Sequence, residues 1–247
     1  MTIRQRTSVV LRGPVFLSML IAGALNAAPI LTPPSLSPGD SYQLLFVTSA
    51  LVDARTFSTN ISAYDAFVQN VANLAGLNTI NGQPVTWLAI GSTDTTNAKD
   101  HDIQSAAIYN LQAQLLFPPG TLWVDITQPH VPVLYNEFGT AEPFPVYTGT
   151  LPSGLGASGS TLGGDPLIVI GGFANLTGEP WVDDGGLAGA LPLYALSSPI
   201  TVVPEPSAIQ LLVVGLATLA ISRAAGGNGA RAGRNGFIFP GLDRPPI

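Results

Sequence analysis

Three carboxylates within six residues form the most suggestive chemical group in the middle of this 247-residue sequence. They are Glu179, Asp183 and Asp184, and Trp181 lies between them. Ca²⁺ binds carboxylate oxygens, but it takes about six to eight oxygen ligands, more than these side chains alone supply. The sequence therefore predicts an exposed acidic turn with Trp181 packed beneath it, and calcium binding by the three carboxylates is the alternative.

A second polar group follows an apolar stretch at 85–90. Its members are Asp94, Asn97, Asp100, His101 and Asp102. Their spacing lacks the glycine and the closing glutamate of an EF-hand loop. His101 stands between two aspartates, a setting that suits a metal ligand or a base, but the only other histidine in the sequence, His130, is not at a useful spacing from it. The sequence predicts a hydrogen-bonded surface loop here.

The sequence lacks the familiar motifs of nucleophilic catalysis. It contains no cysteine, which excludes thiol chemistry and cysteine-ligated zinc. No Gly-x-Ser-x-Gly motif follows a predicted strand. The carboxylate pair of a glycosidase is defined in space, so the sequence does not reveal it. We predict that the protein is not an enzyme, with a secreted hydrolase that uses Asp94, Asp100 or Glu179 as the alternative.

The N-terminus has the layout of a secretory signal peptide, which we place at 1–28. Arg4, Arg6 and Arg12 precede an apolar stretch at 15–25, and small residues around Ala28 offer cleavage sites. The apolar stretch is shorter than the roughly 20 residues that a spanning helix needs. We expect export from the cytoplasm and removal of this segment.

The C-terminal region combines a short motif, an apolar run and basic residues. Val203, Pro204, Glu205, Pro206 and Ser207 precede an apolar run at 208–221, which we expect to be a hydrophobic helix. Basic residues follow it and favour the cytoplasmic side of a membrane. They are Arg223, Arg231, Arg234 and Arg244. The run is short for a span, although local thinning of the bilayer accommodates short helices.

This order of motif, apolar run and Arg223 resembles the PEP-CTERM sorting signal of bacterial surface proteins, over residues 203–223. The resemblance implies recognition by an exosortase-type membrane enzyme and transfer to the cell envelope or to the exopolysaccharide layer. The chain departs from the usual pattern because a basic, glycine-rich tail continues at 224–247, and we expect that tail to be disordered.

The region between the two terminal segments is acidic. Residues 29–203 contain two basic and thirteen acidic residues, a net charge of −11. Nucleic acids and anionic lipids bind clustered lysine and arginine, so this composition argues against both as partners. Many glycines and prolines, with few charged residues, favour a loop-rich body that contains β-strands.

The apolar pattern of this region predicts one main helix among short strands. Tyr64, Phe67, Val68, Val71 and Leu74 recur at helical spacing, which predicts a helix near 61–75. Composition and turn residues predict strands in the remaining apolar segments. These lie at 42–48, 85–90, within 103–117, and at 122–126, 133–135, 146–148, 167–170 and 193–196. The glycine-rich segment at 149–164 is predicted to be a loop.

Several short segments resemble bacterial domains of the C-type-lectin and endostatin-like fold. They are FVTS at 46–49, TWLAIGST at 86–93, VYTGT at 146–150, Trp181 and LYALS at 193–197. The resemblance implies a single α+β domain at 39–199 in which the first and last strands pair and long loops carry any binding site. It also implies calcium triplets in sugar-binding members, which Glu179 and Trp181 match only in part.

We therefore expect an exported, envelope-associated protein with a binding or structural role. A calcium-dependent carbohydrate-binding lectin is a further alternative. The expected partners are the exosortase-type enzyme and a surface glycan.

Overall fold

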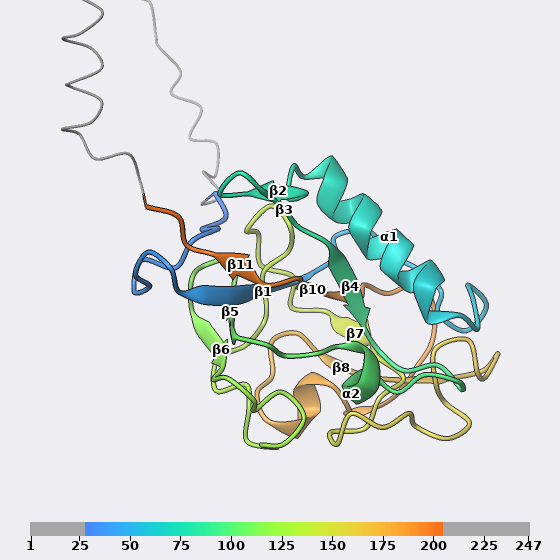
Figure 1. Ribbon diagram of the computed structural model, residues 1–247. Coiled ribbons are helices and arrows are strands. Elements are labelled where there is room, and N and C mark those ends of the chain that lie inside the picture. The colour runs from blue at the N-terminus through green and yellow to red at the C-terminus, as the bar shows by residue number, and fades with distance from the viewer. Residues whose placement is uncertain (1–27, 205–247) are drawn as a thin grey trace, which may run out of the picture.

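The computed structural model describes residues 28–204, which form a mixed α+β fold (Figure 1). The predicted signal peptide at 1–28 lies outside this range except for Ala28. Also outside it are Glu205, Pro206, Ser207, Arg223, the apolar run at 208–221 and the tail at 224–247. Within the described range, no helix is both long enough and apolar enough to span a membrane.

The main sheet is built around β1 (Ser41–Val47), as the apolar segment at 42–48 predicted. Its strand order is β4 (Trp87–Ile90), β10 (Tyr194–Ser197), β1, β5 (Ala107–Asn110) and β6 (Leu115–Phe117). β1 pairs parallel with β5, whereas the other neighbours are antiparallel. Tyr42 to Val47 are all buried, so β1 is covered on both faces and reads as a continuous apolar run.

The first strand pairs with the last two strands, as the fold resemblance implied. β1 pairs antiparallel with β10 and, nearer its start, with β11 (Ile200–Thr201). Val202 extends this ladder because its N–H donates to the Asp40 carbonyl and its own carbonyl accepts from Gly39. The pairing brings the two ends of the described chain to the same side of the body (Figure 1).

The main helix, α1 (Ile61–Leu74), covers one face of the sheet. Asn60 caps its N-terminus by accepting a hydrogen bond from the Ser62 N–H, and Gly76 has a φ of +77° just beyond its end. The helix packs on β4 and β10, and its buried residues Tyr64, Val68 and Val71 belong to the same core as residues of β1. The helix prediction near 61–75 is therefore confirmed.

Helix α1 also protects the edge strand β4. The side-chain amide oxygen of Gln69 accepts from the Trp87 N–H at 2.8 Å, and a carboxylate oxygen of Asp65 accepts from the Ala89 N–H at 2.9 Å. Unpaired N–H groups on an edge strand invite pairing with other chains. In this protein the side chains of Gln69 and Asp65 accept hydrogen bonds from two such N–H groups of β4, which are therefore not available to another strand.

The opposite face of the main sheet packs on a second layer. This layer contains a three-stranded antiparallel sheet of β7 (Pro145–Tyr147), β8 (Val169–Phe173) and β9 (Gly185–Leu187). A short 3₁₀ helix, η1 (Glu179–Trp181), lies beside β8. One hydrophobic core lies between the two layers and contains Trp181, Val146 and Leu122 together with residues from the inner face of the main sheet.

The remaining elements are short. A hairpin of β2 (Thr79–Ile80) and β3 (Gln83–Pro84) turns at Asn81 and Gly82, and α2 (Ala98–His101) is a single turn. Strands predicted at 85–90, within 103–117, and at 146–148, 167–170 and 193–196 correspond to β4, β5 with β6, β7, β8 and β10. The segment at 149–164 is a loop, as predicted.

Two strand predictions were wrong. Residues 122–126 form turns, because the N–H groups of Val124 and Asp125 both donate to the Thr121 carbonyl. Residues 133–135 form no strand, because Leu134 adopts a φ of +53° and only Tyr135 makes an isolated bridge.

Candidate functional site

The acidic group around η1 is an exposed turn over a buried tryptophan, as predicted. Trp181 is 3% exposed, whereas Glu179 and Asp184 are exposed and Asp183 is half-buried. Burial, together with the charges of Glu179 and Asp184, raises the pKa of Asp183. The three carboxylates therefore lie near enough to repel one another.

The calcium alternative requires these side chains to surround a common point. Within residues 28–204, no three histidine, cysteine, aspartate or glutamate side chains gather closely enough to hold a metal ion. Glu179, Asp183 and Asp184 do not fit a three-carboxylate cage in this arrangement. Calcium binding at this turn stays a prediction of the sequence.

The acidic residues of the hydrolase alternative lie in different environments. Asp94 accepts a short hydrogen bond from the Thr161 hydroxyl in a polar hollow. Asp100 is exposed and accepts from the Asn97 amide at 3.0 Å, and Glu179 begins η1. The hollow beside Asp94 is lined by neither Asp100 nor Glu179.

His101 belongs to a three-residue ion cluster. Its Nδ1 lies 2.8 Å from an Asp102 oxygen, and its Nε2 lies 3.0 Å from an Asp65 oxygen. The other oxygens of the two aspartates accept from backbone N–H groups of Gly91 and Ala89. The cluster thus joins α1, α2 and the end of β4. We call Asp65, His101 and Asp102 the histidine clamp.

The electrostatics of the histidine clamp are those of a structural ion pair. Hydrogen bonds to Asp102 and Asp65 raise the pKa of His101 to about 10. Burial raises the pKa of Asp102 to about 7, and the adjacent imidazolium opposes that rise. A protonated imidazole with both N–H groups donated has no lone pair to accept a proton. His101 is therefore unsuited to act as a general base at neutral pH.

The sequence placed His101 in a polar surface loop and missed its partner on α1. His101 and Asp102 are neighbours in the chain, but Asp65 lies on a helix 36 positions earlier. The sequence contains one hint of this partner, because Asp65 is the single acidic residue in the predicted helix at 61–75.

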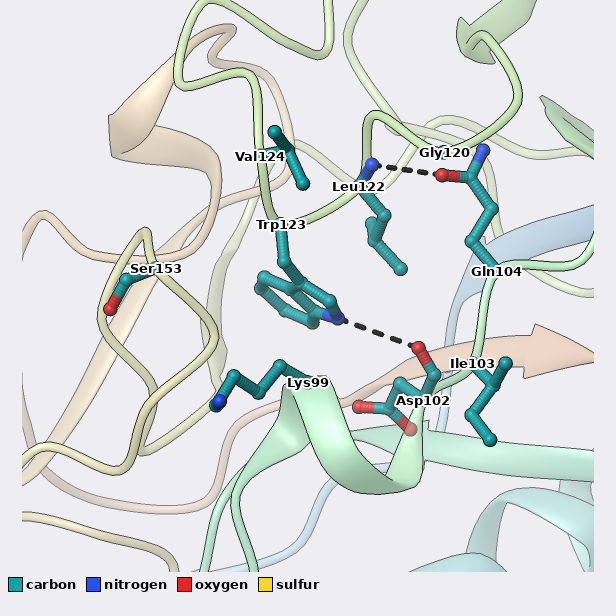
Figure 2. Close-up of a pocket in the computed structure, with 9 residues that line it drawn as sticks. All are labelled: Lys99, Asp102, Ile103, Gln104, Gly120, Leu122, Trp123, Val124 and Ser153. Carbon is teal, nitrogen blue, oxygen red and sulfur yellow. Dashed lines mark hydrogen bonds between the residues drawn. The ribbon is translucent and has the colours of Figure 1, made fainter.

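A hollow with aromatic, apolar and polar side chains lies beside α2 (Figure 2). We call it the Trp123 pocket. It has a volume of about 350 Å³, and the turn at 120–124, α2 with the residues after it, and the loop at 151–155 form its walls. The residues that line it are Lys99, Asp102, Ile103, Gln104, Gly120, Leu122, Trp123, Val124 and Ser153.

Backbone and side-chain hydrogen bonds hold the walls of the Trp123 pocket. The Gln104 side chain accepts from the Leu122 N–H at 2.9 Å and donates to the Pro118 carbonyl at 2.6 Å. The indole N–H of Trp123 donates to the Asp102 carbonyl at 3.4 Å (Figure 2). These contacts fix the turn that carries Trp123 against the segment after α2.

Two further contacts position the indole of Trp123. It stacks near Trp181, with ring centroids 6.0 Å apart and planes inclined by 27°. Gly154 lies so close to Trp123 and Lys99 that a Cβ there would stand within 2.9 Å of both side chains. The loop at 151–155 therefore reaches the indole only because residue 154 is glycine.

The sequence did not predict this pocket. Trp123 was assigned to a strand, and Lys99 was one of two bases in an acidic region. No protein-family model matches the chain, and no curated protein is significantly similar to it.

Proposed function

We propose that this chain is an exported surface protein whose body binds a glycan of the cell envelope without catalysis. A PEP-CTERM-type signal would deliver it, through an exosortase-type enzyme, to the envelope or to the exopolysaccharide layer. We also propose that the body has the C-type-lectin-like arrangement, which the pairing of β1 with β10 and β11 supports.

The observation that carries the binding role is the place of the Trp123 pocket. Both ends of the described chain leave the body on the side of β11 and the β2–β3 hairpin, whereas α2 lies at the opposite side (Figure 1). Because Lys99 of α2 lines the pocket, the pocket lies on the side of the body opposite to the two ends of the described chain. A body tethered by its ends would present such a pocket outward.

Retention on polysaccharide tests the binding role. We expect immobilised extracellular polysaccharide of the native host to retain the protein, and Trp123→Ala to lower its affinity about tenfold, because a half-buried aromatic supplies much of the contact area of such a site. Phe144→Ala is the matched control, since Phe144 is an exposed aromatic (52%) outside the pocket.

Two results would contradict this proposal. If the polysaccharide retains Trp123→Ala as well as it retains the unsubstituted protein, the binding site is not the Trp123 pocket. New reducing ends released from the polysaccharide would show an enzyme, and the hydrolase alternative would then hold.

The sorting role has its own test, because the motif begins where the folded body ends. Val202 is the last residue in the β-ladder, and Val203 and Pro204 beyond it are exposed. Residues before proline avoid helix, so this exit stays extended. We expect intact-mass measurement on native envelope material to find a species of about residues 28–204, and alanines at Pro204, Glu205 and Pro206 to trap the longer precursor.

A permanent membrane protein would give a different mass. If most of the unsubstituted protein at steady state still carries residues 208–247, the sorting role is wrong, whatever the polysaccharide experiment shows.

A further inference from the structure

We infer that the Trp123 pocket binds a carboxylate-bearing sugar ring, a uronate of an acidic polysaccharide, with the ring against Trp123 and its carboxylate paired with Lys99. The inference deepens the proposed function and rests on it, because it names the class of glycan.

The first argument is the state of the two basic side chains in residues 28–204. Arg55 is engaged: its Nε and one Nη donate to the two oxygens of Asp53 at 2.8 and 2.6 Å. Lys99 has only a loose contact, 3.8 Å from an Asp100 oxygen, and its side chain is 43% exposed. Lys99 is thus the base in the described range with spare donor capacity, and it lines the pocket.

The second argument is the kind of hydrogen-bonding group that the pocket leaves free. The Gln104 side chain is used at both ends, and both Asp102 oxygens accept bonds from the protein. The polar side-chain groups that remain are the Lys99 ammonium and the hydroxyl of exposed Ser153, whose loop lies on the side to which the lysine extends (Figure 2). An ammonium only donates, so the matching group on a ligand is an acceptor, best an anion.

The third argument is the apolar part of the pocket. Ile103 is 67% exposed and Val124 is 81% exposed, and both line the pocket with the half-buried indole of Trp123. A small inorganic anion would leave these side chains in water. A pyranose ring has C–H faces that cover apolar surface, and the carboxylate at its edge reaches a cation beside that surface.

The net charge of the body makes the interaction selective. Residues 29–203 carry a net charge of −11, which repels long polyanions from most of the surface. Binding of a polyuronate therefore needs a local contact that outweighs this repulsion, and added salt screens the repulsion as well as the Lys99 pair. Nonspecific attraction of polyanions is not expected.

The test uses the full-length protein in detergent micelles with defined polymers. The probes are polyglucuronate, polymannuronate and polygalacturonate, each beside its carboxyl-reduced neutral counterpart. We expect at least one polyuronate to bind and carboxyl reduction to weaken it about tenfold, the loss of one charge-assisted contact. Lys99→Gln should weaken binding of the polyuronate by the same factor and leave the reduced polymer unchanged.

Arg55→Gln is the matched control, because it removes the other positive charge of the body at a site outside the pocket. It should bind as the unsubstituted protein does. Thermal unfolding of each variant checks that Lys99→Gln is folded, and Lys99→Arg should restore binding.

Each other result overturns the inference in a distinct way. If a polyuronate and its reduced form bind equally, the pocket takes neutral sugar, and the proposed function stands without the uronate. If Arg55→Gln weakens binding as much as Lys99→Gln, the effect is one of net charge. If no polymer of either kind binds while host polysaccharide is retained, the ligand is another glycan. If neither the polyuronates nor the host polysaccharide bind the protein, the proposed function is wrong as well.

Discussion

Replacing Trp181 with alanine will lower the free energy of unfolding by about 4 kcal/mol, because a large buried aromatic leaves a cavity that the body cannot fill. The side chain is 3% exposed. Its ring centroid lies 5.2 Å from the ring centroids of both Phe117 and Tyr194, and the Tyr194 hydroxyl donates to the Trp181 backbone carbonyl. Urea denaturation followed by circular dichroism measures the loss.

Two variants bracket this result. Trp181→Phe keeps an apolar ring in the same space and should cost about half as much or less. Phe138→Ala truncates an aromatic that is 52% exposed and should change stability by less than about 0.5 kcal/mol. A loss of under about 1 kcal/mol in Trp181→Ala would mean that the layer beneath the main sheet is not packed around this ring.

Trp181 also supports the Trp123 pocket, since the two indoles stack. The acidic turn, whose sequence suggested calcium, thus contributes to the body through its buried tryptophan. The adjacent Trp123 pocket is lined by residues from three other segments.

The sequence predicted the elements whose apolar patterns are local. The helix at 61–74 has apolar residues at helical spacing, a capping Asn60 and Gly76 beyond its end, so every local signal agrees. β1 was equally clear, because a strand covered on both faces is a continuous apolar run.

The segment at 122–126 shows why alternation alone misleads. Leu122, Val124 and Ile126 alternate with other residues, but Val124 is 81% exposed and Ile126 is 56% exposed. The turn is held by Gln104, which binds the Leu122 N–H, and by Asp125, which accepts from the Thr127 N–H at 3.0 Å. The Gln104 contact joins residues 18 positions apart and the Asp125 contact is a local turn bond, and neither leaves a periodic signal.

The sequence did not predict the Trp123 pocket or the histidine clamp, and the reason is the same for both. Lys99 and Trp123 meet only because α2 and the turn at 120–124 pack together with Gly154 between them. Asp65 and His101 meet across α1 and α2. In each case the residue types were visible in the sequence, but their proximity depends on tertiary packing.

The histidine clamp predicts that the protein loses stability as the pH rises from neutral toward 10. The pKa of His101 is raised from 6.5 to about 10 in the folded state, so the folded protein holds a proton that the unfolded chain releases. The contribution of His101 is therefore complete below pH 6.5 and is lost as the pH rises through about 10. The raised pKa of Asp102 acts in the same direction at lower pH, between 3.8 and about 7.

His101→Gln isolates this effect. At pH 6 the variant should be less stable by about 3 kcal/mol, because the two hydrogen bonds that the imidazolium donates to the carboxyl groups of Asp102 and Asp65 are lost. The gap should narrow above neutral pH and close near pH 10, where the imidazole of the unsubstituted protein is also neutral. Urea denaturation at a series of pH values measures both curves.

His130→Gln is the matched control, because His130 is exposed and forms no part of the clamp. Its stability should follow the unsubstituted protein across the whole range. If the unsubstituted protein is equally stable at pH 7 and pH 10, or if His101→Gln shows the same decline with rising pH, then His101 does not carry the proton. The two aspartates would in that case be held by their backbone N–H partners, and the junction of α1, α2 and β4 would not depend on an imidazolium.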